Sequence, residues 1–178
     1  MSGTYWKPRP KLGDIVECSF PQQAGVPGPK NRPALVLQVE EATDDPAGSV
    51  VVVAYATSQN TTAVYPGEFV IEAGAKAGLT KATKFDLVNH HRLPFDDAWF
   101  APAPGKTPRY PRRGRLDLQD AAVKRKLQSA IVEAKSQPKN FSGAHRIIIR
   151  SCQWRCPRSS ALNRSQRAFA LPRDMRTN

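Results

Sequence analysis

The stretch that decides the fold is GPKNRPALVLQV, residues 28–39, where an arginine and a proline precede a strongly apolar run. Proline favours extended backbone in the residue before it, and it cannot donate a hydrogen bond to a neighbouring strand. We therefore expect a buried strand to begin here, with the Arg32 side chain at the edge of the sheet. The preceding segment, PQQAGVPGPKN (21–31), is rich in proline and glycine and is predicted to be an exposed, mobile loop. An arginine at a strand end beside such a loop is suited to binding a phosphate.

Four more segments share the short apolar or alternating pattern of β-strands: LGDIVECSF (12–20), SVVVVAYATSQ (49–59), GEFVIE (67–72) and ATKFDLVN (82–89). Residues 94–114 are rich in proline and end in a basic cluster, which predicts a loop or arm. Asp117 is expected to cap the N-terminus of an amphipathic helix over 117–135. The sequence thus predicts a mainly β (α+β) fold, a small curled sheet or β-barrel with a C-terminal helix.

The basic residues of the chain are concentrated near its C-terminal end. The chain has 178 residues and a net charge of +12, and residues 139–178 contain nine Lys or Arg against one acid. Excess positive charge favours polyphosphate partners, because binding releases counterions from a nucleic acid. Length and charge together predict one folded domain over 1–138 and a basic C-terminal extension over 139–178 without a fold of its own.

Several features that the sequence lacks bear on the protein's cellular location and on its bound cofactors. It has no apolar run long enough to span a bilayer, and its first residues lack the apolar stretch of a secretory signal. The three cysteines are too few and too scattered for a disulfide framework, and Cys152 and Cys156 lack the second pair of ligands that a structural zinc site needs. We therefore predict a soluble, cytoplasmic protein with no bound metal, no cofactor and no membrane association.

The order of these motifs resembles that of a known family. Between about Lys11 and about Lys135 the chain contains, in order, KLGDIVECSF, a Gly/Pro loop, NRPALVLQV, VVVAYATSQ, GEFVIE, AGLTKATKFDLVN and an amphipathic helix. This order is similar to that of the PemK/MazF family of toxins. The resemblance implies an SH3-like β-barrel that forms a homodimer and cleaves single-stranded RNA, including mRNA, at short sequences without a metal. It also implies a type II toxin–antitoxin system, in which an acidic, flexible segment of the cognate antitoxin occupies the RNA-binding cleft and the pair binds DNA.

The resemblance carries the family's active-site residues onto this chain. The arginine of the R-P motif falls on Arg32, and the threonine that ends the third strand falls on Thr57. An Arg-x-Asp pair of some members falls on Lys84 and Asp86, so the aspartate is present and the arginine is a lysine. We predict Arg32, Thr57 and Asp86 as catalytic residues, with Asp86 as general base and Arg32 neutralising the charge that develops on the phosphate. The alternative for Asp86 is a surface ion pair with Lys81 or Lys84.

The predicted RNA contacts are polar or basic residues beside these positions and in the basic cluster: Ser58, Gln59, Lys30, Lys84, Arg109, Arg112 and Arg113. Some family members carry a histidine or glutamate in the loop before the R-P motif. This loop has neither residue type, and its candidates for acid or base are Gln22, Gln23 and Lys30. His90 and His91 stay outside the predicted catalytic set, because surface or structural roles are commoner for such residues.

Two rival hypotheses follow from the departures from the family pattern. The same barrel could be a non-catalytic module that binds nucleic acid or a protein such as gyrase, since fold does not fix function. The lysine at position 84 and the missing acid or base group in the loop leave this alternative open. The chain could also be a degenerate relative whose arginine-rich ending reflects a lost or shifted terminus.

Overall fold

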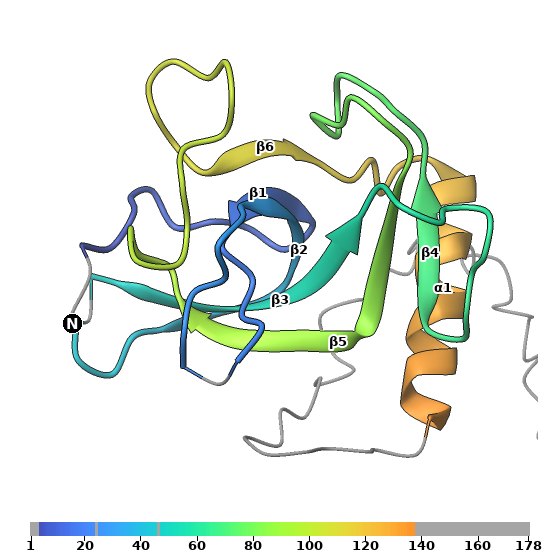
Figure 1. The fold of residues 1–178 in the computed structure, drawn as a ribbon, viewed down its shortest axis with the longest axis horizontal. Coiled ribbons are helices and arrows are strands. Elements are labelled where there is room, and N and C mark those ends of the chain that lie inside the picture. Colours follow the sequence, from blue (N-terminus) through green and yellow to red (C-terminus); the bar gives the residue numbers. More distant parts are fainter. Residues whose placement is uncertain (1–3, 24, 46, 138–178) are drawn as a thin grey trace, which may run out of the picture. The chain divides into compact units, whose positions relative to one another are not determined.

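The computed structural model describes residues 4–137 apart from residues 24 and 46, and the predicted extension over 139–178 lies outside the described residues. The elements of the described part, drawn in Figure 1, are β1 (Asp14–Cys18), β2 (Arg32–Glu41), β3 (Ser49–Thr57), β4 (Glu68–Ile71), β5 (Thr83–Pro94), β6 (Arg112–Arg115) and α1 (Ala121–Ser136). The strands form one antiparallel sheet in the order β4-β5-β3-β2-β1-β6. The sheet curls into a half-barrel, which confirms the predicted mainly β fold with a helix after the last strand.

β2 and β3 form the centre of the sheet. β2 begins at Arg32, as the Arg-Pro pair predicts, and residues 34–37 are buried. The β2–β3 ladder pairs Ala34 with Tyr55, and the β3–β5 ladder pairs Tyr55 with Asp86. Paired residues of neighbouring antiparallel strands direct their side chains to the same face of a sheet, so these three share one face.

A packed apolar core covers one face of the sheet. Its buried members are Val16, Cys18, Phe20, Ala34, Val36, Val51, Val53, Leu93, Phe95 and Phe100. The N-terminal segment closes over this core, where the indole N–H of Trp6 donates to the carbonyl oxygen of Phe100 at 3.0 Å. Burial of apolar surface contributes roughly 25 cal/mol per Å², so this core fixes the sheet on which the strand ends of β2 and β3 are carried.

β5 is longer than the predicted strand, because it continues past residue 89 to Pro94. Its ladder with β3 contains a bulge: Tyr55 pairs with Asp86, whereas the preceding residue of β3 pairs with His90. Residues 87–89 therefore have no partners in β3, and the ladder resumes after them. A bulge of this kind interrupts the period-2 pattern on which the sequence prediction depended.

The basic cluster that was predicted as part of a loop or arm forms the edge strand β6, so the prediction was wrong for Arg112–Arg115. Two ion pairs attach β6 to β1: Arg113 Nη1 lies 3.0 Å from Glu17 Oε2, and Arg115 Nε lies 2.8 Å from Asp14 Oδ1. Both carboxylates are buried. The acidic partners belong to the first strand, far away in sequence, and local composition could not reveal them.

α1 packs alongside β4, as Figure 1 shows, and buries Leu127 and Ala130. Its N-cap is Asp120, which accepts hydrogen bonds from two backbone N–H groups of the first turn, and this corrects the predicted cap at Asp117. Asp117 instead forms an ion pair with Lys76. Within the described residues, no helix has the length and apolar character needed to cross a membrane.

Candidate active site

Arg32 and Thr57 lie at the same end of two neighbouring strands, as the first residue of β2 and the last residue of β3. The β2–β3 ladder pairs Ala34 with Tyr55, and continuing this register by two residues brings Arg32 opposite Thr57. Opposed residues of an antiparallel pair direct their side chains to the same face. The register therefore brings together, on one face and at one edge, the two side chains that the sequence singled out.

Tyr55 supports the Arg32 side chain from below. The guanidinium carbon lies 5.8 Å from the centroid of the Tyr55 ring, within the range of a cation–π contact. Phe20 packs edge-on against Tyr55 at 5.1 Å between ring centroids and against His91 at 4.9 Å. Arg32 has no carboxylate partner in the described part of the chain. Its charge is thus oriented by an aromatic ring and not neutralised by an acid.

Asp86 faces the same end of the sheet from β5, where it pairs with Tyr55. Its Oδ1 accepts hydrogen bonds from the backbone N–H groups of Val88 and Asn89 at 2.9 and 3.1 Å, which stabilises the bulge. Neither of the two lysines proposed as alternative partners forms an ion pair with it among the described residues. One carboxylate oxygen of Asp86 therefore has a structural role, and the two hydrogen bonds hold the group in a fixed orientation.

Lys84, predicted to contact RNA, is engaged inside the protein instead. It is 6 % exposed, and its ammonium lies 2.9 Å from Oε2 of Glu68. The same ammonium donates to the carbonyl oxygen of Ala63 at 2.8 Å and lies 5.4 Å from the centroid of the Tyr65 ring. The charge of Lys84, which stands where some family members have an arginine, is therefore compensated by Glu68.

The other predicted RNA contacts divide into two groups. The first group is exposed to solvent and consists of Lys30, Ser58, Gln59, Arg109 and Arg112. The second is Arg113 alone, whose guanidinium binds Glu17 and donates to the carbonyl oxygen of Gly78 at 3.2 Å. Arg113 is thus engaged in the attachment of β6 to its neighbours, because its charge is balanced within the protein.

The loop that precedes Arg32 is exposed over most of its length and fixed at its base. The Ser19 hydroxyl donates to Oδ1 of Asn31 at 2.6 Å, and the Gly28 N–H donates to the carbonyl oxygen of Ser19 at 3.0 Å. A Cβ on Gly28 would lie 2.3 Å from the carbonyl oxygen of Phe20, so the close approach requires glycine. The chain therefore enters β2 from a defined position, which orients Arg32.

Burial changes the protonation of two groups near the site. Burial lowers the pKa of His91, and the neighbouring His90 lowers it further, so the imidazole favours its neutral form. Burial raises the pKa of Glu17 even though Arg113 acts in the opposite direction. Across the described residues, no group of three or more His, Cys, Asp or Glu side chains is arranged to hold a metal ion.

Three residues around the site were not identified from the sequence: Tyr55, Phe20 and Glu68. Tyr55 precedes Thr57 by two residues, so strand periodicity places both on one face, and this signal could have identified it. Nothing in the segment that begins at Glu68 indicates its pairing with Lys84, because the two residues meet only when β4 and β5 pair.

The fold and the site together define a small curled β-sheet domain with an arginine and a hydroxyl group at one strand end. Residues 11–94 match the family model described as the PemK-like, MazF-like toxin of type II toxin-antitoxin systems. The matched segment includes β1 to β5 and the positions of Arg32, Thr57 and Asp86. This part of the chain is therefore similar to the PemK-like, MazF-like toxin family. A comparison with curated proteins found no match.

Proposed function

We propose that the protein is a metal-independent endoribonuclease that cleaves single-stranded RNA at selected sequences and acts as the toxin of a type II toxin–antitoxin system. The observation that carries the proposal is the alignment of Arg32 with Thr57 at one strand end, with Asp86 on the same face. The family match over 11–94 and the net charge of +12 support it, since a basic protein favours a polyanionic substrate.

The proposed reaction is an attack of the ribose 2′-oxygen on the adjacent phosphorus. The O2′–P bond forms and the P–O5′ bond breaks, which leaves a 2′,3′-cyclic phosphate and a 5′-hydroxyl. Asp86 accepts the proton of the 2′-hydroxyl through the carboxylate oxygen that does not bind the bulge. The departing 5′-oxygen takes up a proton from solvent water as it leaves.

Arg32 and Thr57 hold the phosphate in this scheme. A cation–π contact with Tyr55 orients the guanidinium and leaves its N–H donors for two phosphate oxygens, whose charge grows in the phosphorane. The Thr57 hydroxyl oxygen accepts the N–H of Gln59 at 3.1 Å, so its own hydrogen is free to be donated to the phosphate. The two side chains therefore have complementary tasks, charge neutralisation and positioning.

The RNA strand on either side of the scissile bond is assigned to the exposed polar residues. Lys30, Ser58 and Gln59 adjoin the strand ends that carry the site, and Arg112 begins the edge strand β6, three residues after Arg109. Lys84 and Arg113 are left out of the revised contact set, because their charges are compensated by Glu68 and Glu17.

The proposed partners follow from the same assignment. A cognate antitoxin with an acidic, flexible segment would compete with RNA for the uncompensated charge of Arg32, and the pair would bind DNA. A homodimer in the cytoplasm completes the proposal. A short reading frame that ends in an acidic segment, next to the gene for this protein, is the simplest observation that tests the antitoxin.

A cleavage assay tests the nuclease. The full chain is incubated with a long single-stranded RNA in EDTA, and the ends of the products are mapped for the wild type, Arg32→Ala and Thr57→Ala. Arg125→Ala is the matched control, because Arg125 is an exposed arginine on α1. We expect discrete cuts with the wild type and the control, and their loss in the other two variants.

Binding without cuts would refute the nuclease and favour the rival hypothesis of a non-catalytic RNA-binding module. Cuts that persist in Arg32→Ala and Thr57→Ala would refute the assigned site.

A further inference from the structure

We propose that Lys84 is a positioning residue that holds the β3–β4 loop, residues 58–67, in the conformation that receives RNA beside Thr57. The inference rests on the proposed function and deepens it, because it assigns a role to the lysine that stands where some family members have an arginine. It also connects a buried ion pair to the surface that the substrate would contact.

The Lys84 ammonium contacts the loop at two separated points and the strand that follows it at a third. It donates to the carbonyl oxygen of Ala63 at 2.8 Å and lies 5.4 Å from the centroid of the Tyr65 ring. Its third contact is Glu68 Oε2, at 2.9 Å, in the first residue of β4. One buried cation thus connects the body of the sheet to the middle and the end of the loop.

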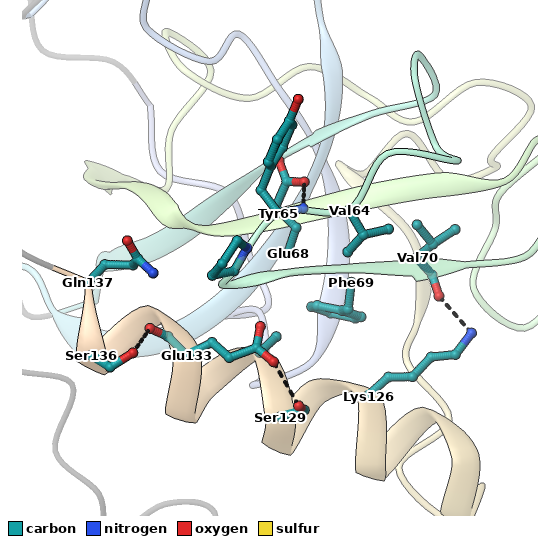
Figure 2. Close-up of a pocket in the computed structure, with 12 residues that line it drawn as sticks. Val64, Tyr65, Glu68, Phe69, Val70, Lys126, Ser129, Glu133, Ser136 and Gln137 are labelled. Carbon is teal, nitrogen blue, oxygen red and sulfur yellow. Dashed lines mark hydrogen bonds between the residues drawn. The ribbon is translucent and has the colours of Figure 1, made fainter.

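Glu68 closes the network from the other side. Its Oε2 accepts the Tyr65 N–H at 2.8 Å, which Figure 2 shows, and its own N–H donates to the Tyr65 carbonyl oxygen at 2.9 Å. The carboxylate therefore binds the loop backbone and the Lys84 ammonium at the same time. Loss of either charged group would release contacts made by the other.

Outside the Lys84 network the loop is held at its end, where the buried Gly67 donates its N–H to Glu133 Oε2 at 3.0 Å and its carbonyl oxygen accepts the Leu87 N–H at 3.0 Å. Residues 58–60 and 62–66 are exposed, whereas the side chains of the Lys84–Glu68 pair are 8 % and 12 % exposed. An exposed segment is readily displaced, so its conformation depends on its few buried anchors. We therefore assign the position of residues 58–66 chiefly to the Lys84 network, which contacts Ala63 and Tyr65.

The loop is directly linked to the proposed catalytic residue. Lys84 is paired with Thr57 in the β3–β5 ladder, and the Thr57 hydroxyl oxygen accepts the N–H of Gln59 within the loop. Lys84 and Thr57 thus occupy paired positions of the adjacent strands β5 and β3. A displaced loop would move Ser58 and Gln59 away from the RNA, and it would leave the chemistry to Arg32, Asp86 and the hydroxyl of Thr57.

Removal of the anchor should weaken substrate binding more than it slows bond cleavage. RNA would then have to order the loop on binding, and this cost appears in KM when the reacting groups keep their places. For Lys84→Met we expect a KM increase of about tenfold with kcat within about threefold of the wild type.

The matched control is Lys126→Met. Lys126 also donates to a backbone carbonyl, that of Val70 at 3.1 Å, but it is exposed and lies on α1 (Figure 2). The full chain carrying each substitution is compared by amide hydrogen exchange over 58–67 and by steady-state RNA cleavage. We expect faster exchange and a higher KM in Lys84→Met, with neither change in Lys126→Met.

A third variant separates positioning from stability. The double substitution Lys84→Met with Glu68→Met removes both charges, so no unpaired charge is left buried. We therefore expect this variant to fold even if Lys84→Met alone does not. We expect this variant to show the same fast exchange of 58–67 and the same rise in KM.

Unchanged exchange of 58–67 in the double variant would overturn the proposal. A loss confined to kcat would also overturn it, because Lys84 would then act on the chemistry. Failure of the wild type to cleave RNA would refute the proposed function instead, and the exchange comparison would still decide whether Lys84 anchors the loop.

Discussion

Thr57 lies between two cationic side chains that differ in whether a carboxylate neutralises their charge. Arg32, on the β2 side, lies over the Tyr55 ring and has no carboxylate partner in the described residues. Lys84, on the β5 side, is 6 % exposed and paired with Glu68. The two residues have the same charge and flank the same position, yet only one has a charge left for a ligand.

The difference follows from where each residue stands in its strand. Arg32 is the first residue of β2, so its side chain lies at the end of a central strand. Lys84 is the second residue of β5, which pairs with β4 and lies beside the β3–β4 loop. A buried ammonium must be paired, because an isolated buried charge costs several kcal/mol or more. An accessible guanidinium has no such requirement and can bind a phosphate.

The largest expected effect is on the rate of RNA cleavage, which should depend strongly on Arg32 and only weakly on Lys84. Under single-turnover conditions with saturating RNA, Arg32→Ala should slow cleavage by about 10³-fold, since it removes charge stabilisation of the phosphorane. Lys84→Met should remain within about threefold of the wild type in the same assay, since its role is in binding. Equal losses in the two variants would contradict the comparison.

Asp86 provides the next test, because its carboxylate has both a structural and a proposed catalytic task. Asp86→Asn keeps an oxygen acceptor for the N–H groups of Val88 and Asn89 but cannot accept a proton at neutral pH. We expect kcat to fall by about 10²-fold with little change in the unfolding midpoint. Full activity in Asp86→Asn would show that the aspartate acts only on the bulge.

The free energy of unfolding should depend more on Lys84 than on Arg32, which is the reverse of the order expected for the cleavage rate. Lys84→Met leaves the Glu68 carboxylate buried without its partner and should lower the free energy of unfolding by roughly 3 kcal/mol. Arg32→Ala removes a contact with one ring at a strand end and should cost less than about 1 kcal/mol. Urea unfolding at neutral pH measures both values. A larger loss in Arg32→Ala would contradict the assignment of Lys84 as the structural cation.

The smallest expected effect concerns His91, which packs on Phe20 beside Tyr55. Burial lowers its pKa below the ordinary value of 6.5, so below that pH the unfolded chain binds a proton that the folded chain does not. The contribution of neutral His91 to the free energy of unfolding is therefore complete above pH 6.5 and declines as the pH falls below this value. In His91→Phe the free energy of unfolding should decrease less between about pH 7 and pH 5.5 than in the wild type. An unchanged pH dependence would contradict this effect.

The sequence was sufficient to predict the features that depend on local chemistry. The Arg-Pro pair marks the first residue of β2, and the change from apolar to polar character marks the end of β3 at Thr57. Because both strands belong to the matched segment of a known family, their order along the chain also identified the fold class.

The features that sequence could not supply depend on contacts between distant segments. The partner of Lys84 is Glu68, which meets it only after β4 pairs with β5. The partners of Arg113 and Arg115 belong to β1, so a basic cluster that looks like a solvated arm becomes an edge strand. In each case the charge of a side chain was visible in the sequence, and the acid that compensates it was not.

The central claim is that Arg32 and Thr57 act on one scissile phosphate. The most direct measurement is a double-mutant cycle on kcat/KM for RNA cleavage, with Arg32→Ala, Thr57→Ala and the double variant. Groups that act on the same phosphate are coupled, so the double variant should lose at least about tenfold less than the product of the two single losses. Losses that multiply without coupling would contradict the account.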